Sequence, residues 1–321
     1  MHAIGTPQAG ALDQLRRIDV EVPPLAKAEV QVRIVASALN PADLKVLRGD
    51  LAGRLLHART HPLVSGYDFS GVVEASAAGV TDLRAGDEVF GFLPYSSRTK
   101  QGAFAERVVV PRKTIARKPV RVAHDVAAAA ATPGITALQA LRDKGRLPTG
   151  GRLLILGAAG GVGSIAVSIA RAWSKAHVTA VCSTYALDFV RQLGAEEVID
   201  RRQQDPRKLQ GPFDVIFDTA AAYSFASMRH ALSNEGAYVT TLPSLGFMTG
   251  KLMATASKKR CHTIIVKPTQ ADLEQLAELL AAGLQVPIDS RFPVRELSKA
   301  CERLERGEMR GRIVVDVATG W

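Results

Sequence analysis

Cysteine is scarce in this 321-residue sequence, and the few cysteines form no pattern. The three present are Cys182, Cys261 and Cys301, which lie far apart, and no two are separated by only two residues. This spacing argues against a structural zinc site and against a disulfide framework. Free thiols are typical of a reducing compartment, so we expect a cytoplasmic protein.

Long apolar runs are also missing. The longest, 126–141, is interrupted by Pro133 and Gly134, whereas a membrane-spanning helix needs about 18 consecutive apolar residues. The first 17 residues contain no basic stretch followed by an apolar one, which argues against a signal peptide. We therefore expect no integral membrane segment.

Aromatic residues make up 5% of the sequence and do not alternate with the basic clusters. The 41 basic and 31 acidic residues give a net charge of +10, with the basic residues scattered along the chain. Binding of single-stranded nucleic acid needs stacking aromatics in a basic groove, so we expect no nucleic-acid partner. A solvated basic surface with a pocket for an anionic ligand accounts for the charge better.

The first part of the chain is rich in strand signals. Residues 30–34 alternate between apolar and polar, which is typical of a half-buried strand. Further short apolar stretches at 71–75, 88–90 and 105–110 are separated by turn residues. This spacing predicts a compact, barrel-like, β-rich domain over residues 1–120.

The pattern changes after residue 120. Residues 153–156 form an apolar run without alternation, as expected for a parallel strand covered on both faces. More strand-like stretches follow at intervals of roughly 20 residues. Helical stretches separate them, notably 187–193 and 225–232. We expect an α/β fold with a doubly wound parallel sheet over 121–263. The tail, 264–321, is expected to return to the first domain.

A glycine-rich loop follows the buried strand directly and precedes a predicted amphipathic helix over 164–173. In this position the loop is typical of a dinucleotide-binding turn, whose backbone amides and helix N-terminus meet a pyrophosphate. The alternative is a closely packed strand–helix turn without a ligand. The candidate cofactor-binding residues are Gly157, Ala158, Ala159, Gly160, Gly161, Val162 and Gly163.

The residues that end the next strand select the cofactor. An acid about 20 residues after the glycines would bind the ribose hydroxyls of NAD, but Ser183 and Thr184 occupy this place. Hydroxyls tolerate a 2′-phosphate, and Arg201, after the following strand, would pair with it. We therefore expect NADP(H) as the cofactor. The alternative for Arg201 is an exposed loop position.

Several stretches are specific in combination. They are residues 40–45, 66–71, 86–91, 134–138, 157–163, 193–200 and 311–314. In this order the chain resembles the medium-chain dehydrogenase/reductase superfamily. More narrowly, it is similar to the zinc-free quinone oxidoreductase branch, which includes zeta-crystallin and the enone oxidoreductases. The resemblance covers nearly the whole chain and implies a GroES-like catalytic domain, a Rossmann domain and an active site in the cleft.

The resemblance also implies chemistry without a metal. Zinc-dependent relatives carry a catalytic cysteine where Asn40 stands and a His-Glu pair where Tyr67 and Asp68 stand. They also have a four-cysteine lobe that this sequence lacks. We therefore expect Asn40 at the catalytic centre, with Tyr67 and Asp68 beside the substrate. Asn40 is equally suited to cap the helix that begins at Pro41, and Asp68 to satisfy backbone amides in its turn.

Two catalytic candidates are implied by the enone-reducing relatives. Their lysine at the Lys45 position lies beside the nicotinamide and the substrate, and their threonine at the Thr136 position approaches the nicotinamide. Lys45 would then stabilise the negative charge that develops on the acceptor oxygen. The alternatives are an exposed helical lysine and a threonine bonded to its own helix.

Further cofactor contacts are expected where later parallel strands end, on the ligand side of such sheets. These positions are Thr219, Ala220, Leu242 and Pro243. Arg312 would reach a cofactor phosphate or, alternatively, be a solvated cation. The sequence departs from the family at Ser168, where relatives have glutamine, and at Ala186, near which many have a lysine for the 2′-phosphate.

We therefore expect an NADPH-dependent oxidoreductase that reduces quinones or α,β-unsaturated carbonyls by hydride transfer. One alternative is an enoyl-thioester reductase, which a basic groove beside the cleft would favour. Another is a non-catalytic NADPH-binding structural or regulatory protein. The family implies a homodimer joined across the edges of the Rossmann sheets, to which residues 247–260 are a candidate contributor. The basic segment 51–62 has no assigned role.

Overall fold

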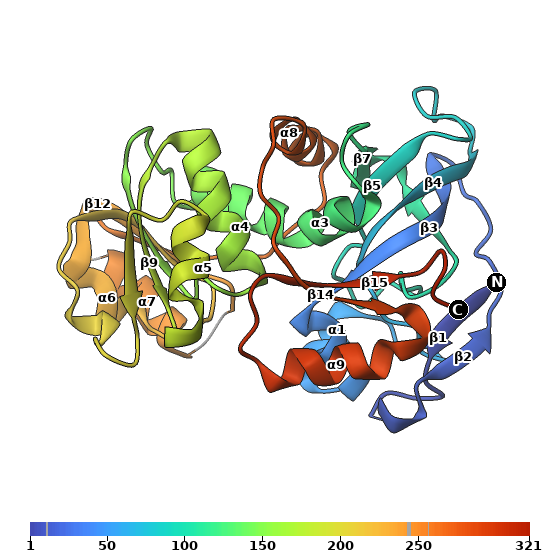
Figure 1. The fold of residues 1–321 in the computed structure, drawn as a ribbon, viewed down its shortest axis with the longest axis horizontal. Coiled ribbons are helices and arrows are strands. Elements are labelled where there is room, and N and C mark those ends of the chain that lie inside the picture. Colours follow the sequence, from blue (N-terminus) through green and yellow to red (C-terminus); the bar gives the residue numbers. More distant parts are fainter. Residues whose placement is uncertain (11, 243–244, 256) are drawn as a thin grey trace.

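The computed structural model describes residues 1–10, 12–242, 245–255 and 257–321. The chain forms two lobes, each built on one large β-sheet (Figure 1). The first lobe contains both ends of the chain, and the second is formed by the middle of the sequence. The predicted α/β fold is confirmed.

The sheet of the first lobe has seven strands. Its order is β14-β15-β3-β4-β5-β7, and β6 pairs with β3 outside this path. Val30, Val32 and Ile34 are buried, as the alternation over 30–34 predicts. The strands are β3 (Glu29–Leu39), β4 (Asp68–Ser76), β5 (Glu88–Phe92), β6 (Arg107–Pro111), β7 (Ile115–Arg117), β14 (Ile288–Pro293) and β15 (Arg312–Asp316). A separate hairpin pairs β1 (His2–Gly5) with β2 (Arg16–Asp19).

The sheet of the second lobe has six parallel strands in the order β10-β9-β8-β11-β12-β13. Residues 153–156 lie in the central strand and are fully buried, which explains their unbroken apolar run. The strand order reverses on either side of β8, and ligands bind at such a reversal, outside the carboxyl ends of the strands. The strands are β8 (Arg152–Leu156), β9 (His177–Cys182), β10 (Glu197–Asp200), β11 (Phe213–Asp218), β12 (Leu232–Thr240) and β13 (Arg260–Thr263).

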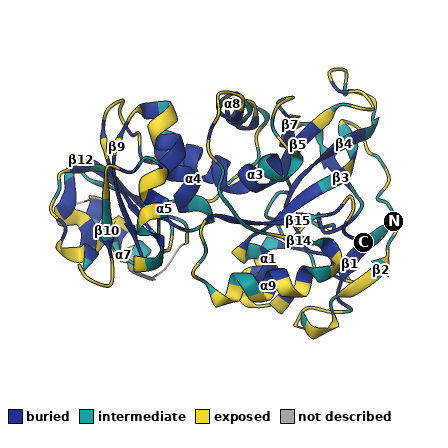
Figure 2. Ribbon diagram, in the orientation of Figure 1, coloured by how far each residue is buried: buried dark blue, intermediate teal, exposed yellow. Residues whose placement is uncertain are grey.

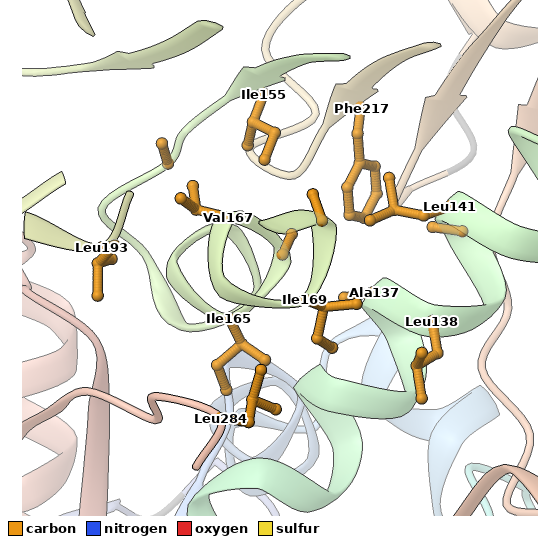
Figure 3. Close-up of a cluster of buried hydrophobic side chains, with 14 of the residues drawn as sticks. Ala137, Leu138, Leu141, Ile155, Ile165, Val167, Ile169, Leu193, Phe217 and Leu284 are labelled. Atoms are coloured by element: carbon orange, nitrogen blue, oxygen red, sulfur yellow. The ribbon is translucent and has the colours of Figure 1, made fainter. Parts of the chain in front are cut away.

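Helix α3 (His124–Leu138) connects the lobes, because it packs on β3, β4 and β5 and also on α4 (Gly161–Ile169). Figure 3 shows Ala137 and Leu138 of α3 beside Ile165 and Ile169 of α4 in a buried cluster. Exposed residues lie mainly on the outer helices and loops (Figure 2). The other helices are α1 (Pro41–Arg48), α2 (Leu51–Leu56), α5 (Leu187–Gln192), α6 (Phe225–Met228), α7 (Leu245–Thr255), α8 (Gln270–Ala281) and α9 (Leu297–Arg306).

The tail returns to the first lobe as strands β14 and β15. Strand β15 lies between β14 and β3, where Ile313 faces Leu39 in the antiparallel register. Just before β15, the backbone N–H of Gly311 donates a hydrogen bond to the Ala159 carbonyl over 3.0 Å. The returning segment therefore contacts the glycine-rich loop of the second lobe.

Two helices differ from their predicted bounds. The helix after the loop begins at Gly161 rather than Ser164, because the loop glycines themselves form its first turn. It continues as a π-helical turn over 170–174. The predicted helix over 225–232 ends early, since Leu232 already belongs to β12. No helix in the described parts of the chain is both long and apolar enough to cross a membrane.

Candidate active site

The glycine-rich loop is closed by contacts that exclude side chains at two of its positions. Gly157 has φ +85°, and a Cβ there would lie 2.9 Å from Thr219 Oγ1. A Cβ at Gly163 would lie 2.3 Å from the Gly157 carbonyl oxygen. A Cβ at Gly160 would instead meet only that oxygen, at 3.6 Å. The loop therefore packs tightly against the sheet but keeps open space in front of Gly160.

A cavity of about 420 Å³ lies in front of the loop and extends to residues 39–41 of the first lobe. The first turn of α4 presents backbone N–H groups to it, as dinucleotide sites do. The predicted residues that line this cavity are Asn40, Ser183, Arg201, Thr219, Ala220, Arg312 and all the loop residues except Ala158. The residues present therefore fit a nicotinamide dinucleotide.

Residues at the end of β11 hold the glycine-rich loop in place. The Thr219 hydroxyl lies 2.8 Å from the Leu156 carbonyl oxygen and 3.1 Å from that of Gly157. The buried Asp218 carboxylate accepts hydrogen bonds from the Tyr238 hydroxyl and the Tyr223 backbone N–H, both over 2.8 Å. Burial raises the pKa of Asp218, and these hydrogen bonds oppose the shift.

One end of the cavity carries hydroxyls and a guanidinium. Arg201 Nε donates to Ser183 Oγ over 2.8 Å, which places both predicted residues at the wall. Thr184 does not line the cavity, because its hydroxyl donates to Asp200 Oδ2 over 2.6 Å. That hydrogen bond is the main cause of the lowered pKa of Asp200. Arg201 also lines an adjoining cavity of about 730 Å³.

The other end is formed by a buried polar network of the first lobe and helix α3. Asp68 is fully buried and accepts from Asn40 Nδ2 over 3.0 Å and from Arg312 Nη2 over 2.7 Å. The Thr132 backbone N–H donates to its other oxygen over 2.9 Å. Arg312 also donates through Nε to the Ala129 carbonyl. Burial raises the pKa of the Asp68 carboxyl, and the Arg312 guanidinium opposes that shift.

Arg312 therefore fits neither interpretation from the sequence completely. It is 3% exposed and ion-paired with Asp68, so it is not a solvated cation. Its side chain also lies against Gly161 and lines the dinucleotide cavity.

Helix α1 holds Asn40 at this network. Pro41 occupies its first position, and the Asn40 backbone N–H donates to Asp43 Oδ2 over 2.7 Å. The other oxygen of Asp43 accepts from the Ser65 hydroxyl and the Gly66 N–H. Burial raises the pKa of Asp43 to about 7. The cap is thus formed by Asp43, and the Asn40 amide is directed to Asp68.

Tyr67 lies beneath the surface rather than in the open cavity. Its ring stacks on Tyr95 with 4.1 Å between centroids. Its hydroxyl donates to the Leu56 carbonyl over 2.8 Å and lies 3.3 Å from His57 Nδ1. Burial raises the pKa of the Tyr67 phenol and lowers that of His57 to about 4.

Three other predicted residues do not line the dinucleotide cavity. Lys45 is half-buried on α1, one turn beyond Pro41. The Thr136 hydroxyl donates to the Thr132 carbonyl of its own helix over 2.7 Å. Leu242 is 45% exposed, and Pro243 lies outside the described residues.

Sequence reasoning missed Tyr185, Tyr223 and Gly311, which also line the cavity. Tyr185 and Tyr223 follow the ends of β9 and β11, so the strand-end argument would have found both. The ion pair between Asp68 and Arg312 spans 244 residues and has no local sequence signal. Among the described residues, no group of three or more His, Cys, Asp or Glu side chains is arranged to hold a metal ion.

Comparisons with known proteins agree on both lobes. An alcohol dehydrogenase GroES-like domain model matches residues 26–120, and a zinc-binding dehydrogenase model matches residues 193–315. The chain is 31% identical to the chloroplast envelope quinone oxidoreductase homolog of Arabidopsis thaliana, over 98% of each chain. It is 34% identical to a mitochondrial NAD(P)H oxidoreductase of Homo sapiens, over 90% of this chain and 82% of that one.

Two further comparisons concern substrate and fold. A trans-enoyl reductase of Aspergillus terreus is 31% identical over 92% of this chain and 88% of its own. The structure of the quinone oxidoreductase from Coxiella burnetii superposes with a TM-score of 0.88 and 28% identity, over 99% of each chain. The similarity therefore extends over the whole arrangement of two lobes.

Proposed function

The chain belongs to the medium-chain dehydrogenase/reductase family, and within that family of NAD(P)(H)-binding oxidoreductases we propose that it is a zinc-independent, NADPH-dependent reductase of quinones or α,β-unsaturated carbonyls. The observation that carries this proposal is the dinucleotide cavity, which extends from Arg201 to Asn40. It joins the glycine-rich loop to Asn40 of the first lobe, so one ligand can contact both.

The preference for NADPH rests on the charge at the Ser183 end. The Arg201 guanidinium lies at the wall and is hydrogen-bonded to the neutral Ser183 hydroxyl, and it forms no ion pair with a carboxylate of the described residues. A 2′-phosphate there gains a charge-assisted hydrogen bond, whereas the ribose hydroxyls of NADH do not. Loop residues 157–163 would hold the pyrophosphate through backbone N–H groups.

When bound, the cofactor supplies a hydride from its nicotinamide ring. The first lobe then has to stabilise the negative charge that forms on the acceptor oxygen. Asn40 and Lys45 would donate hydrogen bonds toward that oxygen, and Thr136 would support the ring position. Tyr67 and Asp68, which are buried, would lie behind the acceptor site. Zinc independence is supported by Asp68, which is already engaged by Asn40 and Arg312.

A second candidate is an enoyl-thioester reductase, because one relative is named a trans-enoyl reductase. Both candidates use the same hydride transfer and differ in the size and charge of the acceptor. A non-catalytic NADPH-binding protein is the third alternative.

We also propose a homodimer and a cytoplasmic location. Strand β13 forms one edge of the parallel sheet, and Met248 and Leu252 on the neighbouring α7 are 69% and 74% exposed. An apolar surface beside a sheet edge supports association between two copies. The three cysteines are free and buried, which agrees with a reducing compartment.

The test is oxidation of NADPH and NADH against a panel of neutral quinones and short enones, followed by the loss of nicotinamide absorbance. We expect turnover with NADPH and a clear preference over NADH. No turnover with any acceptor, despite tight NADPH binding, would favour the non-catalytic alternative.

The role of Lys45 is tested in the same assay. Lys45→Met should lower kcat by about tenfold or more, since a donor to the developing oxyanion is lost, while NADPH affinity changes within a few-fold. The exposed Lys27→Met serves as the matched control. Unchanged turnover in Lys45→Met would remove Lys45 from the mechanism.

A further inference from the structure

A second cavity, of about 330 Å³, lies in the first lobe at the opposite end of α1 from Asn40. Its walls are the last turn of α1, helix α2, residues 57–61 and the loop after β1. Helix α1 has eight residues, so at ~1.5 Å per residue the cavity lies ~12 Å from the dinucleotide site. Its size falls in the range of small-molecule sites.

The wall of this cavity carries positive charge and no carboxylate. Three arginines, Arg48, Arg54 and Arg59, line it, and none of the lining residues is Asp or Glu. Arg48 is neutralised by Glu305 of α9, 2.5 Å away. The nearby Asp50 is engaged in capping α2 through the Gly53 N–H. Arg54 and Arg59 therefore leave two positive charges without a carboxylate partner among the described residues.

Two buried polar atoms of the lining residues have no hydrogen-bond partner within the described part of the chain. They are His57 Nε2 and Thr60 Oγ1. The Tyr67 hydroxyl gives its hydrogen to Leu56, so His57 Nδ1 carries the hydrogen toward Tyr67 and Nε2 is left as an acceptor. Buried polar atoms are normally paired, so unpaired ones at a cavity wall indicate a ligand or water that pairs them.

We propose that this cavity, lined by Arg54, His57, Arg59 and Thr60, binds a phosphate group. Two unneutralised guanidiniums match a phosphate, which carries about −1.5 to −2 charges at neutral pH, better than a single carboxylate. The phosphate belongs either to the tail of the acceptor or to a separate phosphorylated metabolite.

The binding test uses the protein saturated with NADP⁺, so that the glycine-rich loop is already filled. Titration with inorganic pyrophosphate by calorimetry should show binding, weakened about tenfold or more in Arg54→Gln/Arg59→Gln through loss of charge-assisted hydrogen bonds. Arg16→Gln, an exposed arginine of β2, is the matched control and should bind like the wild type. Equal affinity in the wild type and the double variant, or no binding in the wild type, would overturn the proposal.

A kinetic arm distinguishes the two sources of phosphate, and this arm rests on the proposed reductase function. If the phosphate belongs to the acceptor, the double variant raises KM for an enoyl-coenzyme A thioester and leaves KM for a neutral quinone unchanged. If it belongs to a separate metabolite, pyrophosphate changes the turnover of the neutral quinone in the wild type only. Failure of the reductase proposal leaves the calorimetric result intact, so the two failures are distinguishable.

Discussion

The two ends of the dinucleotide cavity are built in different ways. At the glycine-rich loop, the wall is backbone from neighbouring residues, held by Thr219. At the Asn40 end, it is a network of side chains brought together from α1, β4 and β15. The first depends on the absence of side chains, and the second on the exact partner of each charged group. The two ends should therefore fail in different ways when altered.

The largest expected effect is at the buried ion pair. Asp68→Asn leaves the Arg312 guanidinium buried without its counter-charge, which should lower the free energy of unfolding by about 3–5 kcal/mol. Urea unfolding measures the change. Asp188→Asn, whose partner Arg191 lies in an exposed pair, is the control and should cost about 1 kcal/mol or less. A loss in Asp68→Asn as small as in the control would show that Arg312 does not depend on Asp68 for its counter-charge.

The pH dependence of stability also tests the Asn40 end of the dinucleotide cavity. Burial raises the pKa of Asp43 from 3.8 to about 7, so the folded state binds this proton more tightly than the unfolded state. The stability that this proton gives the folded state is fully present below the pKa of Asp43 in the unfolded state. It is lost as the pH rises through about 7. Between about pH 4 and pH 8 we expect a loss of up to about 4 kcal/mol from this group.

Urea unfolding across this range measures the slope, and Asp43→Asn should flatten it. The exposed Asp13→Asn is the control and should keep the slope of the wild type. The same slope in Asp43→Asn would contradict a raised pKa at this carboxyl.

Two glycine variants sharpen the comparison at the loop. In Gly163→Ala the new Cβ meets the Gly157 carbonyl at 2.3 Å, so we expect about 1–3 kcal/mol of lost stability together with weaker NADPH binding. In Gly160→Ala the Cβ enters open space, so stability should hold while NADPH affinity falls, because the pyrophosphate can no longer approach the backbone. Fluorescence titration and thermal unfolding separate the two. Unchanged NADPH affinity in Gly160→Ala would show that the space before Gly160 is not a ligand site.

The smallest expected effect is at the Ser183 end of the dinucleotide cavity. Arg201→Ala should weaken NADPH binding about tenfold, through loss of one charge-assisted hydrogen bond, and leave NADH binding unchanged. Arg202→Ala, whose guanidinium faces Glu308 at 3.8 Å, is the matched control. An equal loss for both cofactors would remove Arg201 from the discrimination.

The difference between the two ends of the dinucleotide cavity also explains which features of the site could be predicted from the sequence. The loop was predictable because a buried strand, glycines and a helix follow one another within 152–169, and each leaves a local signal. The alternation over 30–34 in the first lobe is a local signal of the same kind. Helix bounds were less predictable, since nothing in the sequence around Pro133 indicates that this proline lies inside α3.

The side-chain network was not predictable beyond the identity of its members. Asn40, Asp68 and Arg312 were all candidates, but their partners depend on how β15 lies beside β3. Arg312 illustrates this point, because a lone arginine near the end of a chain carries no sign that it will be buried. The orphaned atoms of His57 and Thr60 likewise follow from packing, although the basic composition of 51–62 was visible in the sequence.

The position of β15 has a consequence for synthesis of the chain. This strand, formed by residues 312–316, lies inside the first sheet between β14 and β3. During translation the earlier strands of that sheet therefore leave the ribosome long before their neighbour does. The six-stranded sheet is complete once residue 263 has been made, so the middle of the chain can fold first. The part of the protein that is synthesised first finishes folding last, with the edge of β3 left open to other chains in the meantime.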